Sequence, residues 1–375
     1  MNALSLFANI GIAEAYLEDI GVNVVLANEL VERRADLYSK IYPFTKMICG
    51  DITDESVYKS LVSEAKKLSV DILMATPPCQ GISRAGKQTE NDIRNLLIVP
   101  VVHMIQDIRP KYCFIENVPQ FTETEITVDG KILLITNYIK QELESIYHIS
   151  VNLIDTKQYG VPQTRQRTII LLSHKNQDVK WELPSPENNL VSLEDAIGEL
   201  PSLDPKIKDV DEAELLNIFP DYYRKVKIAS EVSVWHRPPT HIKRQVVTMM
   251  HTPTGKTAFD NDKYVPTKVN GQPVSGYKST YRRLRWCDPA STVTMDNRKI
   301  SSQNNVHPGR FLGLDENGTV LYSDARALTV FELMRIMSLP DDWPLPKDTN
   351  EAFLRSVIGE GIPPLFMKKV FQKIL

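Results

Sequence analysis

The chain has 375 residues, of which 42% are hydrophobic and 24% are charged. This balance is typical of a globular protein with a real core, and it excludes disordered, collagen-like and low-complexity chains. The length allows two or three domains, and no apolar run approaches the roughly 18 residues that suggest a membrane span. The start of the chain, Met1–Phe7, lacks the basic region and cleavage site of a signal peptide, so we expect none.

The net charge of −3 hides an uneven distribution of charge along the chain. Residues 224–310 contain 16 Lys and Arg residues against five Asp and Glu residues, whereas residues 181–223 contain two against eleven. An asymmetry of this size suggests a basic face for a polyanion such as nucleic acid. A solvated, loop-rich surface is the plainer interpretation, and charge alone does not decide between the two.

The first 175 residues alternate short apolar runs with amphipathic stretches. We expect strands at residues 3–7, 22–27, 46–49, 72–75, 112–116, 148–152 and 168–172, and helices at 13–20, 30–41, 56–68, 96–107 and 132–147. Strands that alternate with helices favour an α/β fold with a mostly parallel sheet and helices on both faces.

The pattern changes after Ser173, where prolines and polar turns punctuate the chain for about a hundred residues. This composition predicts a second, irregular and β-rich unit. Order returns at Thr329, because Thr329 and Glu332 have the spacing of a capping box at the start of a helix. That helix is expected to run to about Met337, and a last helix is expected at residues 365–374.

The segment after the first strand is a candidate for binding a nucleotide-like cofactor, because such sheets place their ligands where a strand turns into a helix. Only one glycine, Gly11, is present there, so the pyrophosphate cradle of NAD and FAD proteins is missing. Glu29 follows the second strand, where an acid can bind ribose hydroxyls, and Asp51 follows the third. An ordinary strand–helix turn with surface acids is the competing interpretation.

Cys79 lies in a loop after the fourth strand that Pro77 and Pro78 stiffen, which makes it a candidate nucleophile. A lone cysteine is more often an inert core residue. Glu116 ends the fifth strand, where partial desolvation would raise its pKa and let it share a proton with a ring nitrogen. A cysteine and a glutamate at adjacent strand ends form a more specific pattern than either residue alone.

The other three cysteines are assigned to the inert class, namely Cys49, Cys113 and Cys287. No C-x-x-C pair occurs, which argues against a zinc site and a disulfide framework and favours a reducing cytoplasm.

Arg165 and Arg167 alternate as the chain enters a late strand, so both side chains are expected on one face. Two guanidinium groups on one face can hold a phosphate or a base carbonyl, although a solvated strand edge is the plainer interpretation.

Together these segments resemble the DNA cytosine-5 methyltransferases, in the family's order and over nearly the whole chain. The matching motifs are the cofactor motif at 7–12, the nucleophile motif Pro78-Cys79-Gln80, the glutamate motif Glu116-Asn117-Val118, the paired-arginine motif at 163–167, the supporting helix at 326–335 and the last motif at 359–364. Three positions depart from the family pattern: Asn9 and Ile12 replace glycines, and Glu360 replaces an asparagine. These departures concern contacts with the cofactor rather than the chemistry.

The resemblance implies a Rossmann-like sheet that binds S-adenosylmethionine, without a metal, and transfers its methyl group to C5 of a cytosine flipped out of a specific duplex DNA site. Cys79 would attack C6 covalently, Glu116 would hydrogen-bond N3 and the exocyclic amine, Arg167 would hold O2, and Arg165 would position the base or its phosphate. The expected cofactor-binding residues are Phe7, Ala8, Asn9, Ile10, Gly11, Glu29, Leu30, Asp51, Ile52, Pro78, Leu97, Glu360 and Gly361.

The resemblance also places a target-recognition domain at residues 176–345, between a catalytic domain at 1–175 and its completing segment at 346–375. The expected DNA-binding residues are Gln80, Ser83, Arg84, Lys87, Arg282, Arg283, Arg285, Arg298 and Lys299. A bacterial restriction–modification enzyme is expected, acting in the cytoplasm as a monomer beside a cognate endonuclease that it does not contact.

Three alternatives remain at this stage. The same chemistry on RNA, as in transfer-RNA relatives with similar motifs, is disfavoured by the long basic region. A DNA-binding protein without catalysis is disfavoured because the cysteine, the glutamate and both arginines occur together. A nicotinamide oxidoreductase is the most distant alternative, because the glycine pattern is wrong.

Overall fold

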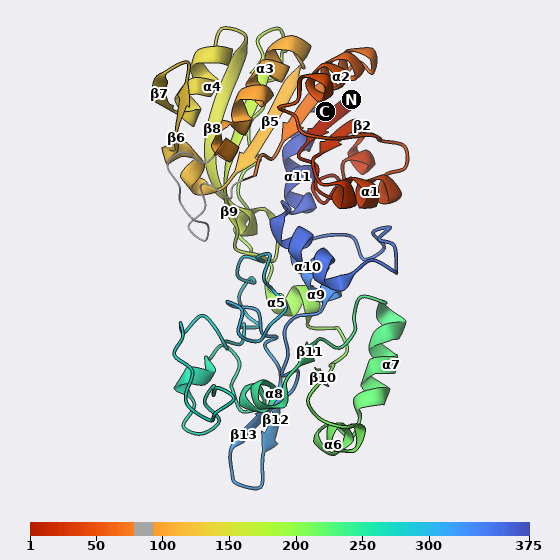
Figure 1. Cartoon of the computed structure of the whole chain (residues 1–375), viewed down its shortest axis with the longest axis vertical. Coiled ribbons are helices and arrows are strands. Elements are labelled where there is room, and N and C mark those ends of the chain that lie inside the picture. The colour runs from red at the N-terminus through yellow and green to blue at the C-terminus, as the bar shows by residue number, and fades with distance from the viewer. Residues whose placement is uncertain (79–92) are drawn as a thin grey trace.

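The computed structural model describes residues 1–78 and 93–375. It consists of an upper part that is built on one large sheet and a lower part that carries only small sheets (Figure 1). Five of the expected site residues lie outside the described residues, namely Cys79, Gln80, Ser83, Arg84 and Lys87.

The upper part is organised by a seven-stranded sheet with the order β3-β2-β1-β4-β5-β9-β8. Its strands are β1 (Asn2–Leu6), β2 (Asn23–Glu29), β3 (Lys46–Cys49), β4 (Ile72–Ala75), β5 (Tyr112–Asn117), β8 (Tyr147–Asp155) and β9 (Gln166–His174). The first five strands pair in parallel, and only β9 runs antiparallel to its neighbours β5 and β8. The prediction of a mostly parallel α/β sheet is therefore confirmed.

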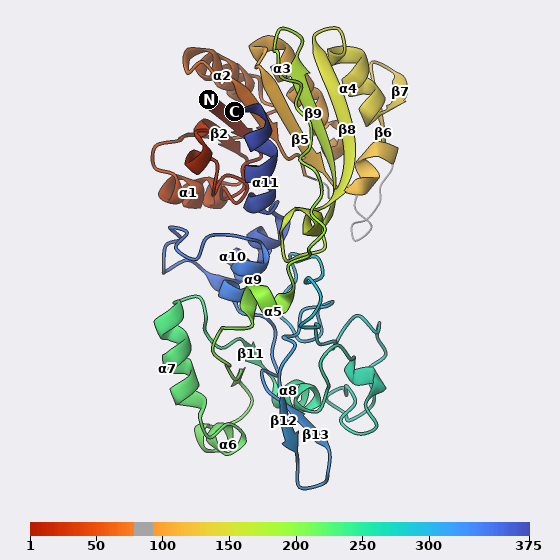
Figure 2. The same cartoon turned by 180° about the vertical axis from the view of Figure 1, so that it is seen from behind.

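Helices cover both faces of this sheet. Alternate residues of each strand point to opposite faces, and both faces carry apolar residues that the helices bury. One face packs against α2 (Glu55–Lys67), α3 (Ile98–Ile108) and α4 (Ile135–Leu143). The other face packs against α11 (Pro364–Phe371), which brings the end of the chain beside its beginning (Figure 2). The helix α1 (Glu32–Ile41) lies at the β2–β3 side of the sheet.

Two expected helices of the upper part differ in the structure. Residues 13–20 form turns and a short 3-10 helix, η1 (Glu18–Ile20), because their backbone hydrogen bonds mostly span three residues. The expected helix at 132–147 is divided into β7 (Lys131–Leu134), α4 and the first residue of β8. The strand β7 forms a hairpin with β6 (Glu125–Val128) around Asp129 and Gly130, whose φ angles of 51° and 75° are those of a two-residue hairpin turn. The Asp-Gly pair was the sequence signal for this hairpin.

The lower part is irregular and its strands are short, as expected, and it also contains helices that the sequence pattern did not indicate. Its helices are α5 (Leu193–Ile197), α6 (Glu212–Ile218), α7 (Tyr222–Val232), α8 (Lys243–Met250), α9 (Val330–Ile336) and α10 (Glu351–Glu360). Its strands form two small sheets, β10 (Lys206–Ile207) with β11 (Thr240–His241) and β12 (Phe311–Leu314) with β13 (Val320–Tyr322). Among the described residues, no helix is long and apolar enough to cross a membrane.

A shared core connects the two parts. Ile10 and Ile12 from the upper part pack in one apolar cluster with residues of α5, α9 and α10. This core joins residues on both sides of the expected domain boundary at residue 175. The division into domains stays a prediction.

A buried ion network lies at the start of α9. The Arg326 guanidinium donates two hydrogen bonds of 2.8 Å to the Glu332 carboxylate and one of 2.9 Å to Asp324. All three side chains are buried, and Thr329 and Glu332 form the capping box that the sequence predicted. Burial alone would raise the pKa of Glu332, but the charge of Arg326 lowers it to about 2.

Candidate active site and cofactor cradle

The ends of β4 and β5 lie side by side at the carboxyl edge of the sheet. Ala75 pairs with Ile115, and the Asn117 side chain donates a hydrogen bond of 3.0 Å to the Pro77 carbonyl. Pro77 lies two residues before Cys79, so the described start of the cysteine loop is held against the strand that carries Glu116. Cys79 itself is outside the described residues.

Glu116 and Arg167 form an ion pair across the β5–β9 ladder. The distance from Arg167 Nε to Glu116 Oε1 is 2.6 Å, and the two side chains are only 13% and 12% exposed. Because β5 and β9 are hydrogen-bonded neighbours, the sheet itself brings the two motifs together. The guanidinium fixes the orientation of the carboxylate, which is what a group that must meet a base edge requires.

Arg165 occupies a different environment from the one expected. It precedes β9, it is 1% exposed, and its guanidinium donates to the carbonyls of Val293, Gly359 and Glu360 at 3.0, 3.1 and 3.3 Å. The structure therefore holds this guanidinium among backbone carbonyls, and its expected role of positioning the base or its phosphate stays a prediction.

The loop after β1 has a backbone that explains one of its departures from the family pattern. Phe7 and Asn9 have φ angles of 58° and 52°, and Asn tolerates this left-handed region better than most residues. Gly11, with φ of 80°, cannot be replaced easily, because an added Cβ would lie 2.1 Å from the Tyr42 ring. The loop between β1 and this turn therefore keeps a tight shape although it contains only one glycine.

Glu29 holds this loop from the end of β2. Its carboxylate accepts hydrogen bonds of 2.9 Å from the backbone N–H groups of Asn9 and Val31. Glu29 is buried, yet each carboxylate oxygen can accept a further hydrogen bond from a ligand. Asp51 is exposed beside the end of β3, where it accepts hydrogen bonds from Thr53.

The remaining expected cofactor residues differ in exposure. Ile52 is buried, Leu97 and Pro78 are partly buried, and Leu30 is 61% exposed. Asn28 was missed by the sequence analysis. Its amide donates to the carbonyls of Ile48 and Gly50 and so ties the ends of β2 and β3 together.

The end of α10 closes the cradle. Asn9 donates from Nδ2 to the Val357 carbonyl at 3.1 Å, and its buried Oδ1 has no hydrogen-bond partner among the described residues. Ile12 packs against Gly361, where an added Cβ would lie 2.8 Å from the isoleucine side chain. Glu360 forms a two-point ion pair with Arg34, at 2.9 and 3.0 Å. All three departures from the family pattern therefore make contacts within one cluster.

Burial raises the pKa of Glu360, Arg34 opposes this shift, and the negative charge of Glu29 adds to it. A second buried carboxyl, Glu14, was missed by the sequence analysis. Burial raises the pKa of Glu14 to about 7, although hydrogen bonds from Ser5 and Tyr38 oppose the shift. Glu14 follows Gly11 in the chain and so lies beside the cradle.

The expected DNA-binding residues of the lower part divide into exposed and buried side chains. Arg282, Arg285, Arg298 and Lys299 are exposed. Arg283 is fully buried, donates 2.8 Å hydrogen bonds to the His307 and Met249 carbonyls, and has a pKa lowered by burial to about 9. The structure thus encloses Arg283 and exposes its neighbour Arg282, since neighbouring residues in an extended segment point to opposite sides.

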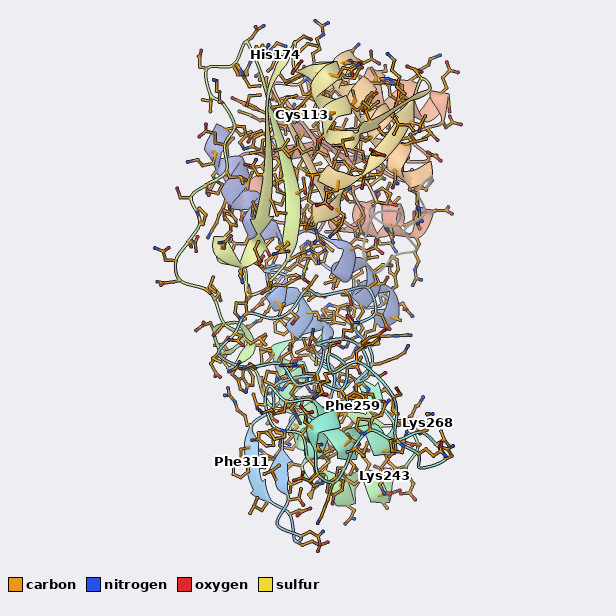
Figure 3. The ribbon with its side chains drawn as sticks, turned by 90° about the vertical axis from the view of Figure 1, so that its left-hand side faces the viewer. Cys113, His174, Lys243, Phe259, Lys268 and Phe311 are labelled. Carbon is orange, nitrogen blue, oxygen red and sulfur yellow. The ribbon has the colours of Figure 1, made fainter. Side chains whose placement is uncertain are left out.

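The remaining cysteines also divide. Cys113 is buried inside the sheet, as expected of a core residue (Figure 3). Cys49 and Cys287 are exposed rather than part of the core. Within the described ranges, no group of three or more His, Cys, Asp or Glu residues could hold a metal ion.

The fold and the site together define the class of this protein. A mostly parallel sheet carries a cofactor-type cradle after β1 and β2, and a glutamate–arginine pair beside a cysteine loop after β4. The whole chain, residues 1–375, matches the model of the C-5 cytosine-specific DNA methylases, and it belongs to this family as a DNA (cytosine-5-)-methyltransferase.

Individual relatives agree with this membership. The chain is 45% identical over 376 residues to the type II methyltransferase M1.HgaI of Avibacterium volantium, covering 99% of this chain and 97% of that protein. It is 26% identical over 396 residues to the type II methyltransferase M.DdeI of Desulfomicrobium norvegicum, covering 100% of this chain and 88% of that protein. The chain is thus a methyltransferase of the type II restriction–modification kind.

A solved structure shares the fold. It is a prophage-encoded protein of E. coli described as a DNA modification methyltransferase, with a TM-score of 0.67 at 18% identity. The match covers 100% of this chain and 98% of that chain.

Proposed function

We propose that this chain transfers the methyl group of S-adenosylmethionine to C5 of a cytosine that is flipped out of a specific duplex DNA site, through a covalent bond between Cys79 and C6. The observation that carries the proposal is the meeting of three motifs at one sheet edge. The Asn117–Pro77 hydrogen bond joins the glutamate strand to the cysteine loop, and the Glu116–Arg167 ion pair adds the arginine motif.

The residues of the cradle fit S-adenosylmethionine. The buried Oδ1 of Asn9, which has no partner among residues 1–78 and 93–375, can accept a hydrogen bond from an amino group, and the Glu29 carboxylate has acceptor capacity left for ribose hydroxyls. When bound, this cofactor supplies an electrophilic methyl group. The Thr76 hydroxyl donates to the Phe7 carbonyl at 3.3 Å, which holds the cysteine loop beside the cradle.

The proposed chemistry needs a nucleophile because C5 of cytosine is unreactive on its own. Addition of the Cys79 thiolate to C6 breaks the aromatic system and places electron density on C5. Glu116 and Arg167 hold the N3 and O2 edge of the ring, where charge develops. C5 then gains the methyl group and loses its proton to a base, and the C6–S bond breaks to release Cys79.

Reaching C6 requires the target base to leave the stack, at a cost of a few kcal/mol. We assign DNA binding on the other side of the site to the exposed basic residues of the lower part. These residues lie in the proposed recognition domain at 176–345. The matching family model is described as a DNA methylase, and no specific observation favours the RNA alternative. We further propose a bacterial cytoplasmic enzyme that acts as a monomer, with an endonuclease that shares its site but does not contact it.

The test is covalent trapping. Bisulfite sequencing of DNA from cells that express the chain identifies the modified site, and a duplex with 5-fluorocytosine at that position is then incubated with the protein and S-adenosylmethionine. We expect a denaturation-resistant adduct, because fluorine cannot leave as the proton does. The Cys79→Ala variant should form none, while Cys287→Ala, which removes an exposed cysteine, should react like the unmodified chain. An adduct with Cys79→Ala would contradict the nucleophile assignment.

A further inference from the structure

The last turn of α10, residues 357–361, lies between the recognition region and the cofactor cradle. On the recognition side, it is covered by the segment 290–297. An added Cβ at Gly359 would lie 2.3 Å from the Thr294 carbonyl oxygen, so the two backbones are in direct contact. The Asn297 amide bridges the same surfaces, with hydrogen bonds of 2.7 Å to the Thr294 carbonyl and 2.8 Å to the Arg355 carbonyl.

On its other side, this turn contacts the cofactor loop and α1. The Asn9 side chain donates to the Val357 carbonyl, Gly361 lies against Ile12, and Glu360 is paired with Arg34. Asn9 also connects to Glu29 through its backbone N–H. A displacement of the α10 turn would therefore shift the loop after β1 and Glu29, which form the cradle.

Arg165 joins the two sides through one side chain. Its Nη1 donates to the Val293 carbonyl of the recognition segment, and its Nη2 donates to the Gly359 and Glu360 carbonyls of the α10 turn. The group is planar and 1% exposed, so it holds these carbonyls at fixed relative positions. The segment 290–297 also pairs directly with the arginine motif, because Ala290 donates to Pro162 and accepts from Thr164.

We propose that Arg165 is a positioning residue that couples DNA binding to cofactor binding. When DNA engages the recognition region, the position of the segment 290–297 is fixed, and Arg165 transmits that position to the α10 turn and the cradle. Thermodynamic linkage makes the effect reciprocal, so bound cofactor tightens DNA binding by the same factor. This inference rests on the proposed function, because it takes duplex DNA and S-adenosylmethionine as the two ligands.

The structure offers a matched control for this role. Arg283 is also buried and also donates to three backbone carbonyls, of Met249, His307 and Asp324, but all its partners lie within the lower part. Lysine at either position keeps a positive charge and loses the planar fork. Arg165→Lys and Arg283→Lys therefore remove similar buried hydrogen bonds, and only the first removes a contact between the two sides.

The experiment measures the Kd of S-adenosylhomocysteine by calorimetry, with and without a saturating duplex that carries the site found by bisulfite sequencing. We expect DNA to tighten binding by a factor of about 5 or more in the unmodified chain and in Arg283→Lys. In Arg165→Lys the factor should fall towards one. An unchanged factor in Arg165→Lys, or an equal loss in both variants, would overturn the inference.

A second variant keeps the test decisive if Arg165→Lys does not fold. Asn9→Gly removes the hydrogen bond to Val357 but keeps a residue that accepts the left-handed φ. Contacts that Asn9 makes with S-adenosylhomocysteine equally with and without DNA cancel in the ratio of the two Kd values. The factor by which DNA tightens binding should therefore also fall in Asn9→Gly. If the unmodified chain binds S-adenosylhomocysteine but DNA does not change the Kd, only the coupling is refuted. If it does not bind at all, the proposed function fails first.

Discussion

The upper and lower parts of the molecule use buried polar groups in different ways. In the upper part, polar side chains gather at the carboxyl ends of the strands, where Glu29, Glu116 and Arg167 face a cradle or an edge. In the lower part, charged groups also lie in the interior, where Arg283, Arg326 and Glu332 are completely buried. Regular strands satisfy their own backbone groups, whereas an irregular chain needs side chains to bind its free carbonyls.

This comparison predicts the largest stability effect in the lower part. Arg326→Met would leave the Glu332 and Asp324 carboxylates buried without their main partner, at a cost of about 3–5 kcal/mol in the free energy of unfolding. Urea denaturation measures the change. The control is Lys278→Met, whose ion pair with Asp260 is exposed and is worth about 1 kcal/mol or less. Similar losses in both variants would show that the buried network stabilises the fold no more than an exposed ion pair does.

The upper part should respond in the opposite way, with loss of activity rather than of stability. Glu116→Gln keeps the shape of the side chain and a hydrogen bond to Arg167, but it weakens the stabilisation of charge in the ring. We expect kcat to fall by about 10²–10³-fold, with a much smaller change in stability than in Arg326→Met. Methyl transfer to DNA containing the mapped site measures kcat. Glu125→Gln, at an exposed position of β6, should keep full activity.

The pH dependence of stability should also distinguish the two parts. The folded state raises the pKa of Glu14 from 4.5 to about 7, so it binds the proton more tightly than the unfolded chain does. The contribution of Glu14 is therefore complete below about pH 4.5 and decreases, by about 3 kcal/mol, as the pH rises to 7. Glu332 behaves in the reverse sense, because its pKa is lowered and its contribution is lost as the pH falls below 4.5.

The Glu14→Gln variant tests this sign. Its stability relative to the unmodified chain should rise between pH 5 and pH 8. In the unmodified chain, the unfolded state gives up the Glu14 proton at a lower pH than the folded state does, and the variant lacks this difference. Unfolding by urea at several pH values gives the difference. A difference that does not vary with pH would contradict the raised pKa of Glu14.

The smallest effect is expected at the exposed arginines of the lower part. Replacing Arg282 and Arg285 by Ala should weaken DNA binding and reduce the slope of log K against log salt by about 2, one for each lost phosphate contact. Titration of labelled duplex at several salt concentrations measures the slope. Lys59→Ala, on the exposed side of α2, should leave the slope unchanged.

Local patterns were sufficient to predict much of the upper part and the start of α9 in the lower part. The strands at 46–49 and 72–75 agree with the structure to the residue, and the capping box at Thr329 forms as expected. The meeting of Glu116 with Arg167 follows from strand order once the two motifs are recognised. These features depend on periodicity and on short-range hydrogen bonds, which a sequence states directly.

Long-range polar contacts could not be predicted in this way. An arginine in a basic stretch is expected to be exposed, and nothing adjacent to Arg165 or Arg283 indicates the carbonyls that enclose them. The tether from Asn9 to Val357 joins residues 348 positions apart. Only the folded chain shows that Asn9, Ile12 and Glu360, which all depart from the family pattern, meet at one turn.

The packing of α11 has a consequence for how the protein is made. Phe366, Met367, Val370 and Phe371 cover the face of the sheet formed by strands from the first half of the chain. While the polypeptide emerges from the ribosome, that apolar face stays uncovered until the residues of α11 have been synthesised. Truncation before residue 364 would thus leave this apolar face of the sheet open to aggregation.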